Sequence, residues 1–94
     1  MKQVFWTDHA IDQLSKIFSY IASDSVAYAK ITIDKITSRS EQISLMPRSG
    51  RKTPEYRDDK IREILEGNYR IIYKILKNQI DVLSVIHMRQ NLKE

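Results

Sequence analysis

Apolar and polar residues follow different periods in the two halves of the chain. Residues 60–89 contain three apolar runs separated by two short polar breaks, Gly67-Asn68 and Lys77-Asn78-Gln79. Glycine and asparagine tolerate the positive φ angles that tight hairpin turns require. This pattern predicts a three-stranded antiparallel meander in the second half of the chain.

The first half shows helical spacing after one short strand. The aromatic and β-branched run 3–6 is long enough for one strand, and Thr7 and Asp8 offer an N-cap for a helix. Apolar residues then recur at spacings of three and four as far as Ala22, and again from Val26 to Ile43. The short polar break at 23–25 favours an antiparallel helix pair lying on a sheet over a coiled coil with a partner chain.

The resulting order, β-α-α-β-β-β, predicts an α+β fold. We expect two antiparallel helices packed on one face of a four-stranded, mainly antiparallel sheet, with the first strand returning to one edge of the meander. A chain of 94 residues is enough for one domain, so we expect residues 1–94 to form it.

Strand alternation places apolar residues on both faces of this sheet. An antiparallel sheet with one face in water alternates more cleanly. Two helices cover one face, and no further segment is left to cover the other. We therefore expect an exposed apolar patch that a protein partner covers. Regular alternation predicts that this patch consists of Ile72, Leu76, Leu83 and Val85.

One long loop, residues 45–59, holds both prolines and follows no period. Loops of more than about 12 residues in compact domains are usually functional or disordered. This loop displays Arg48, Arg51 and Lys52, which makes it a candidate basic site. A solvated linker between helix and sheet explains the same residues equally well.

Charge and cysteine content narrow the partners and the compartment. Sixteen Lys and Arg against twelve Asp and Glu give a net charge of +4, which favours acidic partners, either nucleic acid or an acidic protein segment. The absence of cysteine excludes disulfides and thiolate metal sites and fits a reducing compartment. The sequence shows neither a secretory signal nor a membrane span, so we expect a cytoplasmic protein without membrane contact.

Few residues are candidates for catalysis. His9 and His87 are the only histidines, and neither stands at ligand spacing from a second strong ligand, so we expect no metal and no cofactor. Arginines on neighbouring strands can bind phosphates, and a histidine can exchange a proton near neutral pH. The candidates on the predicted meander are Arg62, Arg70, His87 and Arg89. In the ordinary alternative, Arg62 pairs with a nearby carboxylate and His87 is a half-buried strand residue.

Several short motifs, in this order and spacing, resemble the RelE/ParE superfamily of toxins from type II toxin–antitoxin modules. They are Val4-Phe5-Trp6, Ala10 with Leu14, Tyr20-Ile21-Ala22, residues 47–51 with Pro54-Glu55, Arg62-Glu63, residues 67–73 and residues 85–89. The resemblance covers nearly the whole chain. It implies a toxin, as in plasmid stabilisation systems, that a cognate antitoxin neutralises and that contacts operator DNA only through the antitoxin complex.

The superfamily divides in mechanism. RelE-like members cleave messenger RNA on the ribosome without metal, whereas ParE-like members poison DNA gyrase. Arg70 and Arg89 match family arginines, but Ile61 and Glu63 stand where RelE-like nucleases have a lysine pair, and no tyrosine follows Tyr73 to match their catalytic tyrosine. The resemblance therefore implies a ParE-like, non-enzymatic inhibitor of DNA gyrase. The alternatives are a ribosome-dependent mRNA endoribonuclease and a degenerate toxin that only binds its antitoxin. In the nuclease, the catalytic residues would be Arg62, Arg70, His87 and Arg89.

Overall fold

A computed structural model describes residues 1–90 of the chain and confirms the α+β fold. The helices are α1 (Asp8–Ala22) and α2 (Val26–Leu45), followed by a single 3₁₀ turn, η1 (Pro47–Ser49). The strands are β1 (Gln3–Trp6), β2 (Arg51–Lys52), β3 (Ile61–Glu66), β4 (Tyr69–Ile75) and β5 (Gln79–His87). The short strand β2, inside the predicted loop, makes the sheet five-stranded instead of four-stranded.

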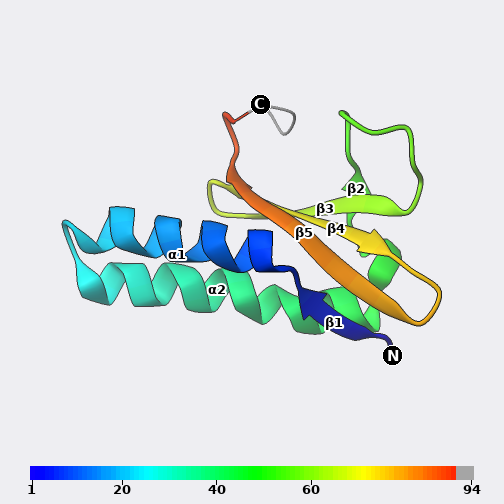
Figure 1. Cartoon of the computed structure of the whole chain (residues 1–94), viewed down its shortest axis with the longest axis horizontal. Helices are drawn as coiled ribbons and strands as arrows, with labels where there is room; N and C mark the ends of the chain where they lie inside the picture. The colour runs from blue at the N-terminus through cyan, green and yellow to red at the C-terminus, as the bar shows by residue number, and fades with distance from the viewer. Residues whose placement is uncertain (91–94) are drawn as a thin grey trace.

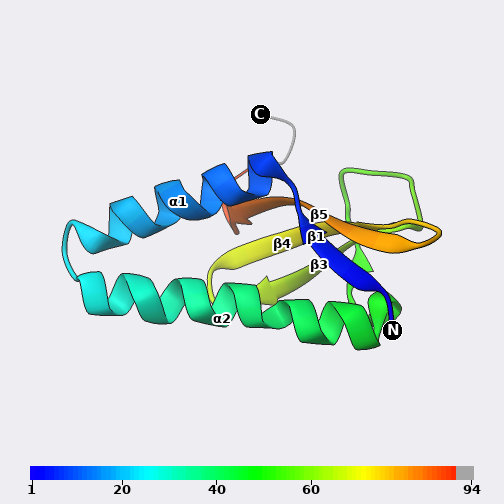
Figure 2. The same ribbon diagram turned by 60° about the horizontal axis from the view of Figure 1, so that its bottom comes forward.

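Within the described residues, the strands lie in the order β1-β5-β4-β3-β2, and only the pairing of β1 with β5 is parallel. The meander β3-β4-β5 and the return of β1 to its edge are as the sequence predicts. Gly67, at the turn between β3 and β4, has the positive φ angle of 56° that this turn needs. The helix pair lies along one face of the sheet and projects beyond the end where this turn lies (Figures 1 and 2).

Thr7 connects the start of α1 to the sheet. Its hydroxyl oxygen accepts a hydrogen bond from the Ala10 backbone N–H at 3.2 Å, which makes it the N-cap of α1. The same hydroxyl donates to the backbone carbonyl of Val82 in β5 at 2.9 Å. Ser25 caps α2 in the same way, because its side chain accepts from the Tyr28 N–H at 3.1 Å. The polar residues before both helices are therefore true helix starts.

The main core lies between the helices and the sheet. It contains one face of β4, with Ile71, Tyr73 and Ile75, as the alternation along this strand predicts. Opposite them, α2 contributes Ile36 and Ile43, which are seven residues apart and fully buried. This two-turn spacing keeps both side chains on the same side of the helix.

The face assignment of Val85 is wrong, because β5 does not alternate regularly. Ile72 pairs with Ser84, but the next residue, Tyr73, pairs with Val82, so one extra residue stands in β5 at Leu83. A bulge of this kind reverses the facing of every residue after it. Val85 therefore joins the helix-side core and is only 2% exposed.

The bulge lies where β1 ends and α1 begins. Beyond Val82, no strand among residues 1–90 pairs with that edge of β5. The side chain of Gln13 in α1 takes that place, since its amide oxygen accepts hydrogen bonds from the Val85 N–H at 2.7 Å and from the Ser84 hydroxyl at 3.0 Å. One side chain of α1 thus satisfies the Val85 N–H, which has no strand partner there.

The second face of the sheet is also covered, contrary to the expectation of an open apolar patch. Ile61, Ile72 and Ile86 form a small buried cluster there, and Ile72 is 1% exposed. The segment between β2 and β3, residues 53–60, is bound to this face through ion pairs from Arg70 to Glu55 and from Lys74 to Asp58. Residues 53–60, most of which belong to the predicted loop, therefore cover part of this face of the sheet.

Candidate functional site

An uncovered groove lies between the projecting helix pair and the end of the sheet. Two adjoining cavities, with volumes of about 660 and 250 Å³, share Tyr69 and His87 in their walls. We call them together the hairpin groove. The larger cavity is lined from α1 and β5, and the smaller from α2 and the β3–β4 turn. The helix residues that line the groove are His9, Asp12, Gln13, Lys16, Ile17, Tyr20, Ile21, Tyr28, Ile31, Thr32, Lys35 and Ile36.

The groove has a mixed polar and apolar lining, and its exposed apolar part consists of tyrosine and isoleucine side chains. Tyr20 is 81% exposed, Tyr28 is 61% exposed and Ile31 is 50% exposed. Large apolar side chains exposed together mark surfaces that bind another protein. Tyrosine suits such a surface because its ring contributes contact area and its hydroxyl remains hydrogen-bonded.

Tyr69 and His87 form the floor shared by the two cavities. They are direct cross-strand partners in β4 and β5, and their rings meet edge to face with centroids 5.7 Å apart. Burial raises the pKa of the Tyr69 hydroxyl, and the neighbouring Tyr28 and Tyr20 add to this increase. The three tyrosines therefore lie close together in the groove.

Arg70 does not offer a free guanidinium. It is 6% exposed and lies on the face of the sheet away from the helices. Both terminal nitrogens donate to the Glu55 carboxylate, at 2.8 and 2.7 Å, and Nε donates to Glu63 at 2.8 Å. These hydrogen bonds, first those with Glu55, raise the pKa of Arg70 even further above its usual range. Arg70 remains a cation whose charge two carboxylates neutralise.

Arg62 lies on the opposite face of the sheet from Arg70, so the two do not form one site. Its guanidinium donates to the carboxylate and the carbonyl of Asp59 at 2.8 and 2.9 Å, and to the Gly50 carbonyl at 3.1 Å. The ordinary reading of Arg62, an ion pair with a nearby carboxylate, is confirmed.

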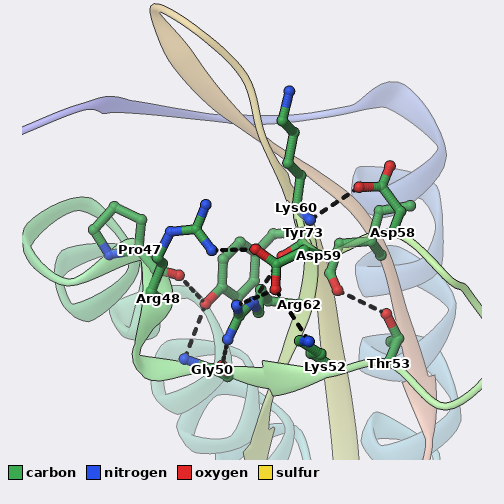
Figure 3. Close-up of polar contacts among 11 residues, drawn as sticks. Pro47, Arg48, Gly50, Lys52, Thr53, Asp58, Asp59, Lys60, Arg62 and Tyr73 are labelled. Atoms are coloured by element: carbon green, nitrogen blue, oxygen red, sulfur yellow. Dashed lines mark hydrogen bonds and ion pairs between the residues drawn. The ribbon is translucent and has the colours of Figure 1, made fainter.

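The basic loop residues Arg48 and Lys52 converge on the same carboxylate as Arg62 (Figure 3). Arg48 reaches Asp59 at 2.5 Å and Lys52 reaches it at 3.4 Å. We call these four residues the Asp59 cluster. The hydrogen bond from Arg48, followed by the effects of Lys52 and Arg62, lowers the pKa of Asp59 to about 2. Arg51 points elsewhere, because its Nε donates to the buried Glu63.

The Tyr73 hydroxyl fixes the loop that carries these cations. It donates to the Pro47 carbonyl at 2.5 Å and accepts from the Gly50 N–H at 3.1 Å (Figure 3). Gly50 has no space for a side chain, because a Cβ there would lie 2.7 Å from the Glu63 backbone oxygen and closer still to the Tyr73 hydroxyl. Burial raises the pKa of Tyr73, so the neutral, hydrogen-bonding form is favoured.

The last two nuclease candidates lie at the end of β5. His87 is exposed and faces the hairpin groove, and its Nδ1 accepts from the Arg89 backbone N–H at 3.2 Å. Arg89 is exposed in the turn that follows β5. The four candidates thus occupy three places: the covered face, the Asp59 cluster and the end of β5.

The remaining members of the predicted apolar patch are Leu76 and Leu83. Both are half-buried, Leu76 just after β4 and Leu83 at the bulge. With Ile72 and Val85 buried, the four do not form one exposed surface. A role for Leu76 and Leu83 in binding a partner stays a prediction.

Within residues 1–90, no group of three or more His, Cys, Asp and Glu side chains is placed to hold a metal ion. In the same part of the chain, neither helix has the length and hydrophobicity needed to span a bilayer.

The sequence family follows from a comparison with family models. The model for the ParE toxin of the type II toxin–antitoxin system, parDE, matches residues 4–92, nearly the whole chain. The chain belongs to the ParE toxin family. It is therefore a toxin of a type II toxin–antitoxin system. The resemblance to the RelE/ParE superfamily that the sequence motifs show is confirmed.

Solved structures show the same fold at low sequence identity. The ParE-family chain is similar to a chain of the chromosomal ParDE toxin–antitoxin system from P. aeruginosa, with 17% identity, a TM-score of 0.78 and coverage of 95% of this chain and 98% of that one. It is also similar to a chain of the RelBE2 toxin–antitoxin complex from Mycobacterium tuberculosis, with 21% identity, a TM-score of 0.65 and coverage of 92% and 96%. No curated protein sequence matches significantly.

Sequence reasoning missed the hairpin groove of this ParE-family chain. The relevant signal was present, because Tyr20 and Tyr28 flank the short break between the helices and do not belong to the apolar stripe that each helix buries. The sequence does not show that both helices extend beyond the sheet (Figure 1). This arrangement places the two tyrosines next to Tyr69.

Proposed function

We propose that this ParE-family toxin inhibits DNA gyrase by binding it, and that a segment of a cognate antitoxin neutralises the toxin by occupying the hairpin groove. The antitoxin part draws on the family and on the solved relatives, both of which are described as belonging to toxin–antitoxin systems. The gyrase part is the expectation for the ParE-like branch.

The single observation that carries the choice of mechanism is the state of Arg70. Metal-independent cleavage of RNA needs basic side chains that reach the scissile phosphate. Arg70 is 6% exposed and its guanidinium is bound by Glu55 and Glu63, so an RNA phosphate would have to displace two carboxylates from it. Arg62 is committed to Asp59 on the other face of the sheet. This arrangement supports a toxin that acts by binding rather than by RNA cleavage.

The hairpin groove supports the antitoxin part of the proposal. It exposes tyrosine and isoleucine side chains that the described chain leaves uncovered, and a partner segment with apolar anchors would bury them. The Lys16 ammonium, which lies at the rim, is already paired with Asp12. Apolar contact in the centre is therefore expected to carry most of the affinity.

The experiment measures two activities of the purified toxin side by side. One assay follows supercoiling of relaxed plasmid by gyrase, and the other follows cleavage of a message during translation. The proposal expects loss of supercoiling with an intact message. The Arg89→Ala variant provides a check, because Arg89 is exposed, and a nuclease that uses it would lose its cleavage activity while keeping its fold. Message cleavage together with normal supercoiling would reverse the choice in favour of the ribosome-dependent nuclease.

Normal supercoiling and an intact message, together with tight antitoxin binding, would identify the protein as a degenerate toxin that only binds its antitoxin. The antitoxin for this arm is the product of the neighbouring open reading frame in the source genome. Leu76→Ser with Leu83→Ser tests the second candidate contact in the same binding assay. If this double variant keeps its stability but binds the antitoxin more weakly, the two leucines contact the antitoxin.

A further inference from the structure

The net positive charge of the chain is not evenly spread. Residues 1–47 contain equal numbers of basic residues (Lys2, Lys16, Lys30, Lys35, Arg39) and acidic residues (Asp8, Asp12, Asp24, Asp34, Glu41). The net charge of +4 therefore belongs to the second half of the chain. Two carboxylates there, the half-buried Glu55 and the buried Glu63, are already paired with Arg70 and Arg51.

Half of this excess lies at the Asp59 cluster. Arg48 from η1, Lys52 from β2 and Arg62 from β3 surround one carboxylate, which leaves two formal positive charges. Arg48 and Lys52 are largely exposed, with 59% and 69% of their side chains accessible. Their cationic groups are therefore within reach of an anion in solution.

The cluster is also fixed in position. Arg62 holds Asp59 and the Gly50 carbonyl together, and the Tyr73 hydroxyl holds Gly50 and Pro47 against the sheet. On the other side of β2, the Thr53 hydroxyl donates to the Ile61 carbonyl at 2.9 Å. Cations attached to such a braced segment lose less freedom on binding than cations on a mobile loop.

We propose that the Asp59 cluster is a binding surface for the phosphodiester backbone of duplex DNA, separate from the hairpin groove. Arginine and lysine are the residues that contact phosphates, and the two net positive charges that remain after pairing with Asp59 suit a ligand with repeated negative charges. Single-strand binding surfaces use several aromatic rings on which bases stack, but residues 47–62 contain only one aromatic residue, Tyr56. Arg48 and Lys52 are the phosphate contacts, and Asp59 is the positioning residue.

The test measures binding of the toxin to a labelled 20-base-pair duplex by fluorescence anisotropy, at several salt concentrations and with two unrelated sequences. The Arg48→Ala, Lys52→Ala double variant is expected to bind both duplexes more weakly and to a similar extent. The slope of log affinity against log salt is negative, and its magnitude should fall by about two, since each phosphate contact contributes about 0.9. Lys30→Glu changes the net charge by the same amount on exposed α2 and is expected to retain the wild-type slope.

Thermal unfolding of both variants verifies that the fold is kept, which the exposure of Arg48 and Lys52 predicts. The proposed site would be wrong if the slope were unchanged in the double variant, or if Lys30→Glu reduced the magnitude of the slope equally. Tighter binding of a single-stranded RNA of the same length would overturn the assignment to duplex DNA. Displacement of the duplex by polyglutamate at equal charge concentration would point to an acidic protein segment instead. None of these outcomes depends on whether the toxin inhibits gyrase.

Discussion

Tyr69 and His87 face each other across β4 and β5, and their rings meet edge to face with an angle of 80° between the planes. The pair lies where the two cavities of the hairpin groove join. One cross-strand contact thus shapes the floor of the surface on which the antitoxin is proposed to bind.

Replacing His87 by alanine is expected to affect binding more than folding. His87 is exposed, so the loss of its ring contact with Tyr69 should reduce the free energy of unfolding by only about 0.5–1.5 kcal/mol. Antitoxin affinity, measured by calorimetry, should fall about tenfold or more because the floor of the groove is lost. Equal antitoxin affinity for wild type and His87→Ala would exclude this floor from the interface.

Arg70 and Arg51 both bind the Glu63 carboxylate, but we expect them to contribute very differently to the free energy of unfolding. Arg70→Met leaves Glu63, which is 1% exposed, without its buried partner, and should lower the free energy of unfolding by about 3–5 kcal/mol. Arg51→Ala removes a largely exposed partner of Glu63 and should cost about 0–1 kcal/mol. Urea denaturation measures both values. Similar costs for the two variants would mean that the covered face is not held together by Arg70.

The Tyr73 hydroxyl is expected to contribute to stability through the loop that it holds. Tyr73→Phe keeps the buried ring but leaves the Gly50 N–H and the Pro47 carbonyl without this partner, at a cost of about 1–3 kcal/mol. Thermal unfolding measures this loss. Gly50→Ala should also destabilise the chain, because its Cβ would meet the Glu63 backbone. Wild-type stability of both variants would show that residues 47–50 are not fixed by Tyr73.

The Asp59 carboxylate makes a pH-dependent contribution. Its pKa is lowered from 3.8 to about 2 in the folded chain, so the stabilisation is complete above pH 3.8 and disappears as the pH falls towards 2. Asp59→Asn lacks this contribution. The difference in melting temperature between wild type and Asp59→Asn should therefore shrink between pH 5 and pH 2. A difference that stays constant over this range would contradict the ion pairs of the Asp59 cluster.

Hydrophobic periodicity was sufficient to predict the helices, the meander and the alternation in β4. These elements depend on local patterns, such as the caps at Thr7 and Ser25 and the turn at Gly67. The bulge in β5 could not be predicted, because it arises where β1 ends and Gln13, some seventy residues earlier in sequence, binds the Val85 N–H. One inserted residue was enough to move Val85 from one face to the other.

The candidate site was less predictable than the fold, since it depends on which charges meet. The sequence shows Arg70 and Glu55 fifteen residues apart, but not that the segment 53–60 folds back and places the carboxylate on the guanidinium. For the same reason, four basic candidates looked like one site although they lie in three places. The projection of the helices beyond the sheet (Figure 1) is likewise a property of the assembled fold, and the hairpin groove depends on it.

The most direct test of the central claim is an antitoxin titration in the gyrase supercoiling assay. Tyr20→Asp with Tyr28→Asp places two charges in the hairpin groove at positions that are 81% and 61% exposed, so the fold should be kept. The control, Val26→Asp, adds a charge at a 52% exposed position outside the groove. All three toxins are predicted to inhibit supercoiling. Antitoxin should restore supercoiling with wild type and the control, whereas the double variant should need at least about thirtyfold more antitoxin. The account would be contradicted if the antitoxin concentration that restores supercoiling with wild type also restored it with the double variant. It would equally be contradicted if the wild-type toxin did not inhibit supercoiling.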